Sequence, residues 1–180
     1  MDKFASSGGG RLFLATLPDP ATAERIHRLA GVLKRAHRFD GRLIAADRLH
    51  VSLFSLTGLP DRQICAACEA AAVLRCEPFE VSFDRTASFR GRIGNRPFVL
   101  IGENGLRRLE AFRGTLGAAL LRSGLRRLAN TNFMPHVTLL YDARGVDEYP
   151  IQPILWTVTE FVLIHSMRGH DYRMRWSLRA

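Results

Sequence analysis

The chain carries two copies of a short pattern whose residue types suit acid–base chemistry on a phosphodiester. Residues 50–53 read His-Val-Ser-Leu, and residues 136–139 read His-Val-Thr-Leu. Histidine readily gives or takes a proton near neutral pH, because its unperturbed pKa is about 6.5. The hydroxyl two positions later is both a donor and an acceptor of hydrogen bonds. Two imidazoles and two hydroxyls that lie together would form a candidate active site.

Each copy lies in an apolar run that predicts a β-strand. Since side chains alternate between the two faces of a strand, His50 and Ser52 share one face, and the valine and leucine between and after them share the other. The second copy, with His136 and Thr138, has the same arrangement. Strict alternation also brings Phe54 to the histidine face, where it is a candidate to stack on a nucleobase.

The elements that must position these motifs alternate along the chain, and the hairpins among them indicate antiparallel sheets. The two motif histidines are 86 residues apart, and the same offset carries residues 12–14 onto residues 98–100. Each half therefore reads strand, helix, motif strand, and the fold class is α+β. Helices are expected over residues 20–37, 61–76 and 104–123, and strands over residues 11–17, 43–45, 49–56, 79–83, 86–93, 97–101, 133–141, 154–158, 160–166 and 172–178.

Two similar halves predict two lobes related by a pseudo-two-fold axis, with helices outside and one motif on each side of a central cleft. Residues 1–10, which end in Ser-Ser-Gly-Gly-Gly, predict a flexible N-terminal tail. Residues 11–180 predict a single two-lobed domain. Asp19 before Pro20 predicts the start of the first helix, and Asn104 the cap of the third. We expect His27 and His37 on the surface, and His165 packed in a strand or at its edge.

The charge of the chain favours a polyanionic or phosphate-bearing substrate. Lys and Arg number 26 against 17 Asp and Glu, and only Lys3 and Lys34 are lysines. Arginine suits phosphate because its planar group donates two parallel hydrogen bonds. Arg90 and Arg92, on a predicted hairpin, are candidates to contact phosphates. The chain shows no apolar run long enough to span a membrane and no secretory signal, so we expect a cytoplasmic protein.

The composition and spacing do not favour a metal centre or a cofactor. Cys65 and Cys68 form a C-x-x-C, but they lie among alanines in a predicted helix and no second pair completes a zinc site. An odd number of cysteines fits a reducing compartment. Asp47 and Asp142, which flank the motifs, are interpreted as turn or strand-end residues. We expect no metal, no cofactor and no membrane partner, and a monomer.

The chain resembles the 2H phosphoesterase superfamily, and most closely the bacterial and archaeal 2′,3′-cyclic phosphodiesterases that have been called 2′-5′ RNA ligases. The resemblance lies in residues 11–20, 48–56, 133–142 and 158–178. It implies a two-lobed α+β fold with antiparallel sheets lining a cleft, and metal-independent opening of a cyclic phosphate. By the same resemblance, His50 is the general acid and His136 the general base, and Ser52 and Thr138 hydrogen-bond the phosphate.

The chain departs from the family pattern at some positions. Ser52 stands where the family usually has threonine, and Tyr141 where many relatives have arginine. Tyr141 is therefore a candidate substrate contact that differs in chemistry from its counterparts. The arginine that relatives often have just before the second motif is missing, since residues 130–132 read Asn-Thr-Asn.

Three interpretations of the function are open. The first is hydrolysis of 2′,3′-cyclic phosphate ends of RNA or nucleotides to 2′-phosphates, with reversible 2′-5′ ligation as a weak activity. The second keeps the site but changes the substrate to a 2′-5′ oligoadenylate or an ADP-ribose cyclic phosphate. The third is a noncatalytic RNA-binding protein. Histidine and hydroxyl in both motifs favour an enzyme, because binding alone does not need two titratable groups.

Overall fold

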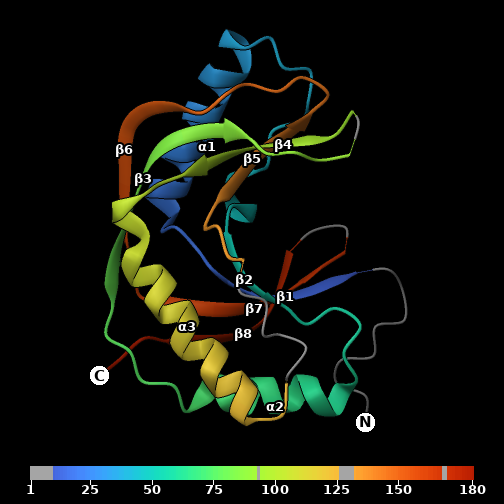
Figure 1. Cartoon of the computed structure of the whole chain (residues 1–180), viewed down its shortest axis with the longest axis vertical. Helices are drawn as coiled ribbons and strands as arrows, with labels where there is room; N and C mark the ends of the chain where they lie inside the picture. Colours follow the sequence, from blue (N-terminus) through green and yellow to red (C-terminus); the bar gives the residue numbers. More distant parts are fainter. Residues whose placement is uncertain (1–9, 93, 126–131, 168–169) are drawn as a thin grey trace.

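A computed structural model describes residues 10–92, 94–125, 132–167 and 170–180. Within these ranges the chain forms two four-stranded antiparallel sheets and three α-helices (Figure 1). The helices are α1 (Pro20–Ala36), α2 (Asp61–Ala72) and α3 (Arg107–Arg122), and the strands are β1 (Arg11–Thr16), β2 (Val51–Ser55), β3 (Phe79–Ser88), β4 (Arg96–Ile101), β5 (Val137–Asp142), β6 (Tyr149–Val158), β7 (Glu160–Ser166) and β8 (His170–Ser177).

The two sheets have equivalent topologies, as the internal repeat predicts. The first sheet has the order β2-β1-β7-β8 and the second the order β5-β4-β3-β6. The 86-residue offset places β1 on β4 and the motif strand β2 on the motif strand β5. Both motif strands are consequently at an edge of their sheet, and the expectation of an α+β fold with two pseudo-two-fold halves is confirmed.

The helices are exchanged between the halves. Although α1 follows β1, it packs on the second sheet, where Arg25 donates a 2.9 Å hydrogen bond to the carbonyl of Pro153 in β6. Although α3 follows β4, it packs with α2 and reaches the first sheet, where Phe112 meets Phe161 of β7 edge to face at 5.3 Å. It also contacts β3 of the second sheet, since Phe112 lies 5.5 Å from Phe79, centre to centre. Figure 1 shows α1 beside β4, β5 and β6 and α2 at the opposite end, with α3 running from the level of β3 down to α2. One hydrophobic core therefore draws residues from both halves.

Some predicted elements differ from the observed ones. The β3 strand runs unbroken over Phe79–Ser88 where two strands are predicted, because a register shift after Phe83 accommodates the change of pattern. The helix α2 ends at Ala72, and Cys76 instead forms a bridge with Arg179. The predicted strand at residues 43–45 is only a bridge between Leu43 and Leu140.

The predicted helix starts have different outcomes. Asp19 caps α1 as expected, since its carboxylate accepts a 2.9 Å hydrogen bond from the backbone N–H of Thr22. Asn104 does not cap α3, because a short 3₁₀ turn precedes that helix and the amide oxygen of Asn104 binds the side chain of Arg107.

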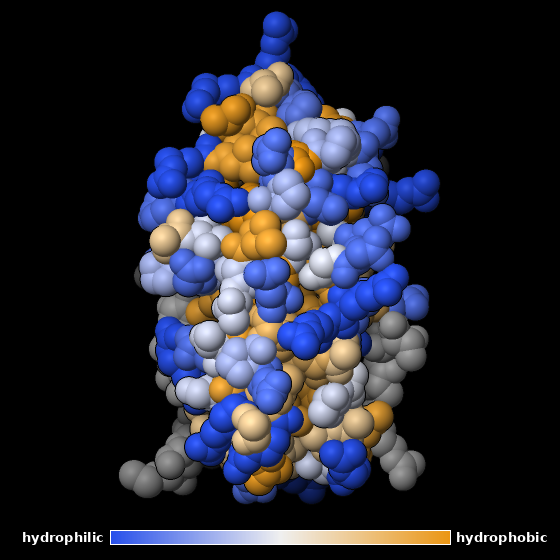
Figure 2. All heavy atoms as spheres, turned by 90° about the vertical axis from the view of Figure 1, so that its left-hand side faces the viewer, coloured by the Kyte–Doolittle hydropathy of each residue, from blue (hydrophilic) through white to orange (hydrophobic). Residues whose placement is uncertain are grey.

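The surface on the β6 side mixes hydrophilic and apolar side chains, with apolar atoms showing between hydrophilic ones in its upper half (Figure 2). Among the described helices, none combines the length and apolar character needed to cross a bilayer. Residues 1–9 of the predicted tail lie outside the described residues.

Candidate active site

His50 lies just before β2, on the face of the first sheet that points away from the helices. Its ring is 4.9 Å from the ring of Phe13, centre to centre. Phe13 belongs to a small apolar cluster with Ala15, Val162 and Ile164, which is separate from the main core. The Nδ1 atom of His50 is 2.8 Å from the carbonyl oxygen of Arg48.

His136 has a matching environment on the second sheet. Its ring meets Phe89 edge to face at 5.1 Å, and Phe89 packs on a second small cluster of Ala87, Val99 and Ile101. The Nδ1 atom of His136 is 2.8 Å from the carbonyl oxygen of Met134, two residues earlier, as in the first motif.

These two contacts fix the tautomer of the neutral form of each ring. A carbonyl oxygen only accepts hydrogen bonds, so Nδ1 carries the hydrogen in both His50 and His136. The Nε2 atom is therefore the position at which each ring takes up or releases a proton. In both motifs, the backbone carbonyl two residues before the histidine thus leaves Nε2 as the atom that exchanges a proton.

The two hydroxyls lie on the same faces as the histidines. Ser52 pairs with Ala15 of β1 and is exposed, and Thr138 pairs with Val99 of β4 and is half-buried. Because directly paired residues point to the same side of a sheet, each hydroxyl shares its face with the apolar cluster beside its histidine.

The alternation does not continue beyond the hydroxyls, because each motif strand contains a β-bulge. The register shifts between Leu14 and Ala15 opposite β2, and between Phe98 and Val99 opposite β5. The extra residues are Leu53 and Leu139, which are themselves 86 residues apart. A bulge adds one residue to one strand, so the face of every later side chain is reversed.

The bulge makes the expectation for Phe54 wrong. Phe54 is 6% exposed and belongs to the main core, so it does not reach the histidine face. Ser55, paired with Phe13, takes that place instead. In the second strand Leu140 is likewise in the core, and Tyr141, paired with Pro97, is 38% exposed on the histidine side.

The carbonyls of the two bulge residues are both satisfied from outside the sheet. The carbonyl of Leu139 accepts a 2.8 Å hydrogen bond from the backbone N–H of Ile44. The carbonyl of Leu53 accepts a 3.1 Å hydrogen bond from Nε of Arg113, on α3. The sequence gives no reason to single out Arg113, because the alternation of apolar and polar residues in β2 does not reveal the bulge whose carbonyl Arg113 binds.

The other candidate residues are not brought into contact with the histidines by any described interaction. Arg90 and Arg92 are exposed on the connection between β3 and β4, where Arg92 bridges to Asn95. His165 pairs with Leu12, so it lies on the helix side of the first sheet, away from the face of His50.

The two histidines of the α1 region are half-buried rather than on the surface. His27 donates from Nδ1 to the carbonyl of Ile44 at 2.9 Å, and Nε2 of His37 is 2.7 Å from the hydroxyl of Tyr149. The prediction that they are surface residues is wrong, because segments distant in sequence cover them.

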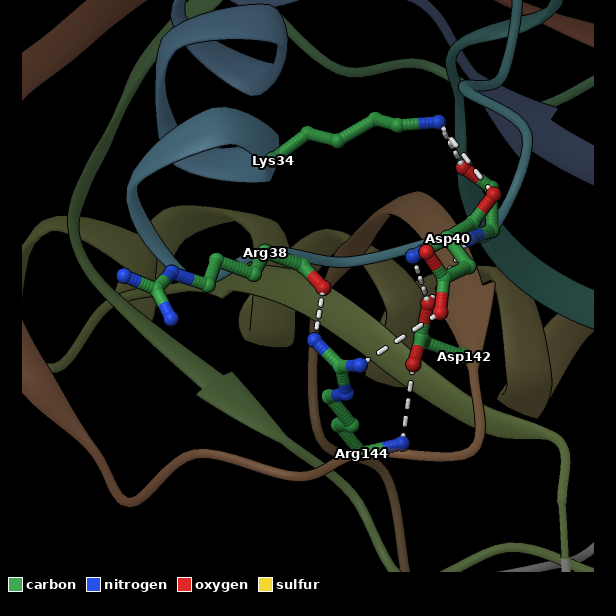
Figure 3. Close-up of polar contacts among 6 residues, drawn as sticks. Lys34, Arg38, Asp40, Asp142 and Arg144 are labelled. Carbon is green, nitrogen blue, oxygen red and sulfur yellow. Dashed lines mark hydrogen bonds and ion pairs between the residues drawn. The ribbon is translucent and has the colours of Figure 1, made fainter.

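Asp142 is a structural residue at the end of β5, as its position predicts. It is 5% exposed, and one carboxylate oxygen accepts from the backbone N–H groups of Asp40 and Gly41 at 2.6 and 2.7 Å. The other oxygen accepts from the N–H of Arg144 at 2.8 Å (Figure 3). Burial raises the pKa of Asp142, but these three donors and the charge of Arg144 outweigh it, so the pKa is lowered.

The same loop is held by two cations. Lys34 donates to the carbonyl of Gly41 at 2.7 Å, and Arg144 binds the carbonyl of Arg38 and lies 3.6 Å from the carboxylate of Asp40 (Figure 3). Arg38 has a φ of 54°, a conformation that non-glycine residues rarely adopt. These contacts fix residues 38–41. The residues that follow, Leu43 and Ile44, pair with β5.

A hollow of about 510 Å³ lies elsewhere, where the end of β1, the start of α1 and the β6–β7 turn meet. Asp19, Glu24, Asp47 and Glu160 line it together with Arg175, and neither motif histidine does. Among the described residues, no group of three or more His, Cys, Asp or Glu side chains is arranged to hold a metal ion.

Comparisons with known proteins agree with this architecture. The structure of Escherichia coli LigT complexed with 3′-AMP matches with a TM-score of 0.71 and 28% identity, over 94% of this chain and 98% of that one. A structure described as a phosphoesterase matches with a TM-score of 0.73 and 27% identity, over 96% and 100%. TT0787 of Thermus thermophilus, 20% identical with a TM-score of 0.72 over 94% and 98%, shares the fold.

A search of curated protein sequences gave no match. The family model described as the 2′-5′ RNA ligase superfamily matches residues 18–170, which include both histidine motifs and the whole second sheet. With the matching pair of motifs on equivalent strands, the chain belongs to the 2′-5′ RNA ligase superfamily of LigT-like 2H phosphoesterases.

Proposed function

We propose that the protein hydrolyses 2′,3′-cyclic phosphate ends of RNA or of nucleotides to 2′-phosphates, without a metal ion. The observation that carries the proposal is the matched pair of histidines, each with Nδ1–H held by the carbonyl two residues earlier and a hydroxyl on the same strand face. Membership of the family supports a phosphodiesterase or RNA-ligase type of enzyme. LigT of E. coli has been solved with 3′-AMP, ATP, NADP+ and phosphate, which supports a nucleotide substrate here.

In the proposed reaction His136 acts as the general base and His50 as the general acid. Neutral His136 takes a proton from water at Nε2, and the water oxygen forms a bond to phosphorus. The bond from phosphorus to the ribose 3′ oxygen breaks on the opposite side, and protonated His50 donates its Nε2 proton to that oxygen. If the 5′ hydroxyl of a second RNA replaces water, the same steps form a 2′-5′ linkage.

The hydroxyls of Ser52 and Thr138 are proposed to donate to the nonbridging oxygens, where charge must be stabilised in the transition state. Each proton transfer contributes roughly 10²–10⁴-fold to the rate. The proposed mechanism assigns both proton transfers and the phosphate contacts to side chains of this chain and needs no metal ion. The assay therefore contains EDTA, which removes divalent ions.

Tyr141, Arg90 and Arg92 are proposed as substrate contacts of the same site. Tyr141 is supported by its pairing with Pro97, on the side of β5 that carries Thr138. A tyrosine ring can stack on a nucleobase, whereas the arginine usual in relatives can bind phosphate. Replacing Tyr141 by alanine is expected to raise KM for a cyclic mononucleotide with little effect on kcat, and an unchanged KM would remove Tyr141 from the site.

The test is hydrolysis of a 2′,3′-cyclic mononucleotide and of a short RNA with a cyclic-phosphate end, in the presence of EDTA. We expect turnover by the wild type and a loss of at least about a hundredfold in His50→Ala and in His136→Ala. His165→Ala is the matched control, because His165 lies on the other face of the first sheet. The position of the phosphate in the product establishes which ribose oxygen leaves.

Other outcomes separate the alternatives. A folded wild-type protein that turns over neither substrate would refute the proposal, and 2′-5′ oligoadenylate and ADP-ribose cyclic phosphate would then be assayed. Binding of RNA without turnover of any of these would favour the noncatalytic interpretation. We also propose a monomer in the cytoplasm, consistent with the three free cysteines in the described residues, and light scattering after gel filtration tests the oligomeric state.

A further inference from the structure

The two helices that cross between the halves carry equivalent residues beside the two bulges. The 86-residue offset superposes the buried positions Ile26 and Ala30 of α1 on Phe112 and Leu116 of α3. It also places His27 on Arg113, although the two side chains have different chemistry. Both of these residues bind the backbone that supports a motif strand.

In the second sheet, support reaches the bulge of β5 through an intermediate segment. His27 donates to the carbonyl of Ile44 at 2.9 Å, and the N–H of Ile44 donates to the carbonyl of Leu139 at 2.8 Å. In the first sheet, the longer side chain of Arg113 reaches the carbonyl of Leu53 directly, at 3.1 Å. The bulge carbonyl of each motif strand therefore accepts a hydrogen bond that comes either from the helix itself, as at Leu53, or from a segment that the helix binds, as at Leu139.

Arg113 also joins the two motifs to each other. Its guanidinium carbon lies 4.4 Å from the ring centre of Phe54 in β2 and 4.3 Å from that of Phe133. Phe133 lies three residues before His136 and leads into β5 of the other sheet. The side chain is half-buried, and burial lowers the pKa of Arg113. One guanidinium thus contacts the segments that carry both motifs.

We propose that Arg113 is a positioning residue, which fixes the motif strand of His50 relative to that of His136. It acts through the bulge carbonyl of Leu53 and through the rings of Phe54 and Phe133, and it is not proposed to touch the substrate. The inference rests on the proposed function, because an in-line displacement needs both histidines aligned on one phosphorus atom. Misplacement of reacting groups by about 1 Å can cost a hundredfold in rate.

The chemistry of arginine explains why this residue type is suited to the position. Its planar group presents two faces to aromatic rings while Nε–H still donates in the plane. Lysine has a compact ammonium at Nζ, which cannot contact two rings and also donate from the position that Nε of arginine occupies. Arg113→Lys is therefore expected to retain the charge but only part of the positioning.

The experiment compares Arg113→Met and Arg113→Lys with Arg122→Met, which alters an exposed arginine on the same helix. Rates are measured on a 2′,3′-cyclic mononucleotide and normalised to folded protein. We expect kcat to fall about tenfold to a hundredfold in Arg113→Met, less in Arg113→Lys, with KM within about threefold in both. Arg122→Met is expected to match the wild type. If Arg113→Met does not fold, Arg113→Lys provides the comparison.

A double-mutant cycle separates positioning from general stability. In the His50→Ala background, alignment of that ring no longer matters, so Arg113→Met is expected to cost less than about threefold in kcat. The same loss in both backgrounds, or an unchanged kcat in the single variants, would overturn the proposal.

A second readout does not depend on turnover. The NMR signals of the His50 and His136 rings are expected to move in Arg113→Met and to stay in place in Arg122→Met. If the wild type is inactive on the cyclic phosphate, the proposed function fails, but this readout still decides the role of Arg113. Unchanged ring signals for both histidines would refute it.

Discussion

Replacement of Asp142 by asparagine is expected to destabilise the fold by about 2–4 kcal/mol at pH 7. The carboxylate accepts three backbone hydrogen bonds, two on one oxygen and one on the other. An asparagine oxygen can keep the pair from Asp40 and Gly41, but its NH₂ then faces the N–H of Arg144, and that bond is lost. A hydrogen bond to a charged group contributes roughly 1.5–3 kcal/mol, and one to a neutral group about 0.5–1.5.

The destabilisation caused by Asp142→Asn is expected to depend on pH. The pKa of Asp142 is lowered in the folded state, against about 3.9 for an unperturbed aspartate. The stabilisation is therefore fully present above the unfolded pKa and is lost as the pH falls through the folded pKa. The free-energy difference between wild type and Asp142→Asn should be largest at neutral pH and should shrink below about pH 4.

Urea unfolding at pH 7, 5, 4 and 3 measures this difference. For a chain of this size the expected change at pH 7 corresponds to a lowering of Tm by about 4–16 °C. Asp147→Asn is the matched control, because Asp147 is exposed in the same connection. Equal unfolding free energies for wild type and Asp142→Asn at pH 7, or a difference that grows on acidification, would refute the reasoning.

Two further predictions concern close packing and thiol reactivity. Gly41→Ala is expected to cost about 1–3 kcal/mol in urea unfolding, because its Cβ would lie 1.9 Å from the carbonyl oxygen of Tyr141; Gly114→Ala, whose Cβ would meet nothing within 4 Å, should not destabilise, and equal effects would contradict this. Burial raises the pKa of the Cys68 thiol to about 11, so only about one molecule in a thousand carries that thiolate at pH 8, and alkylation followed by mass spectrometry should modify the exposed Cys65 first. Equal rates at both thiols would contradict the buried position of Cys68.

The parts of the fold that follow from local chemistry could be predicted from the sequence. The cap at Asp19 and the equivalence of β1 with β4 were predicted, because a side-chain cap and an apolar run are local signals. The shared face of His50 and Ser52 follows from strand alternation over two residues.

The parts that depend on distant segments could not be predicted. Alternation placed Phe54 on the histidine face, but the bulge at Leu53 moves it into the core, and the donor that satisfies the bulge comes from α3. His27 looked like a surface residue because nothing near it in sequence indicates that Ile44 lies beside it. In each case the deciding contact joins segments that neither pattern nor propensity connects.

The exchange of α1 and α3 between the sheets makes the two lobes topologically intertwined. Neither half of the chain contains a complete lobe, because the first sheet joins β1 and β2 to β7 and β8, and the second sheet takes β3 from the first half. A fragment with one motif would therefore lack strands of its own sheet. Moving the sheets apart as rigid bodies would strip apolar side chains from a shared core, at a cost of roughly 25 cal/mol for each Å² exposed. The separation of the two motif strands is thus set by the same cooperative unit that holds the chain folded, rather than by a hinge.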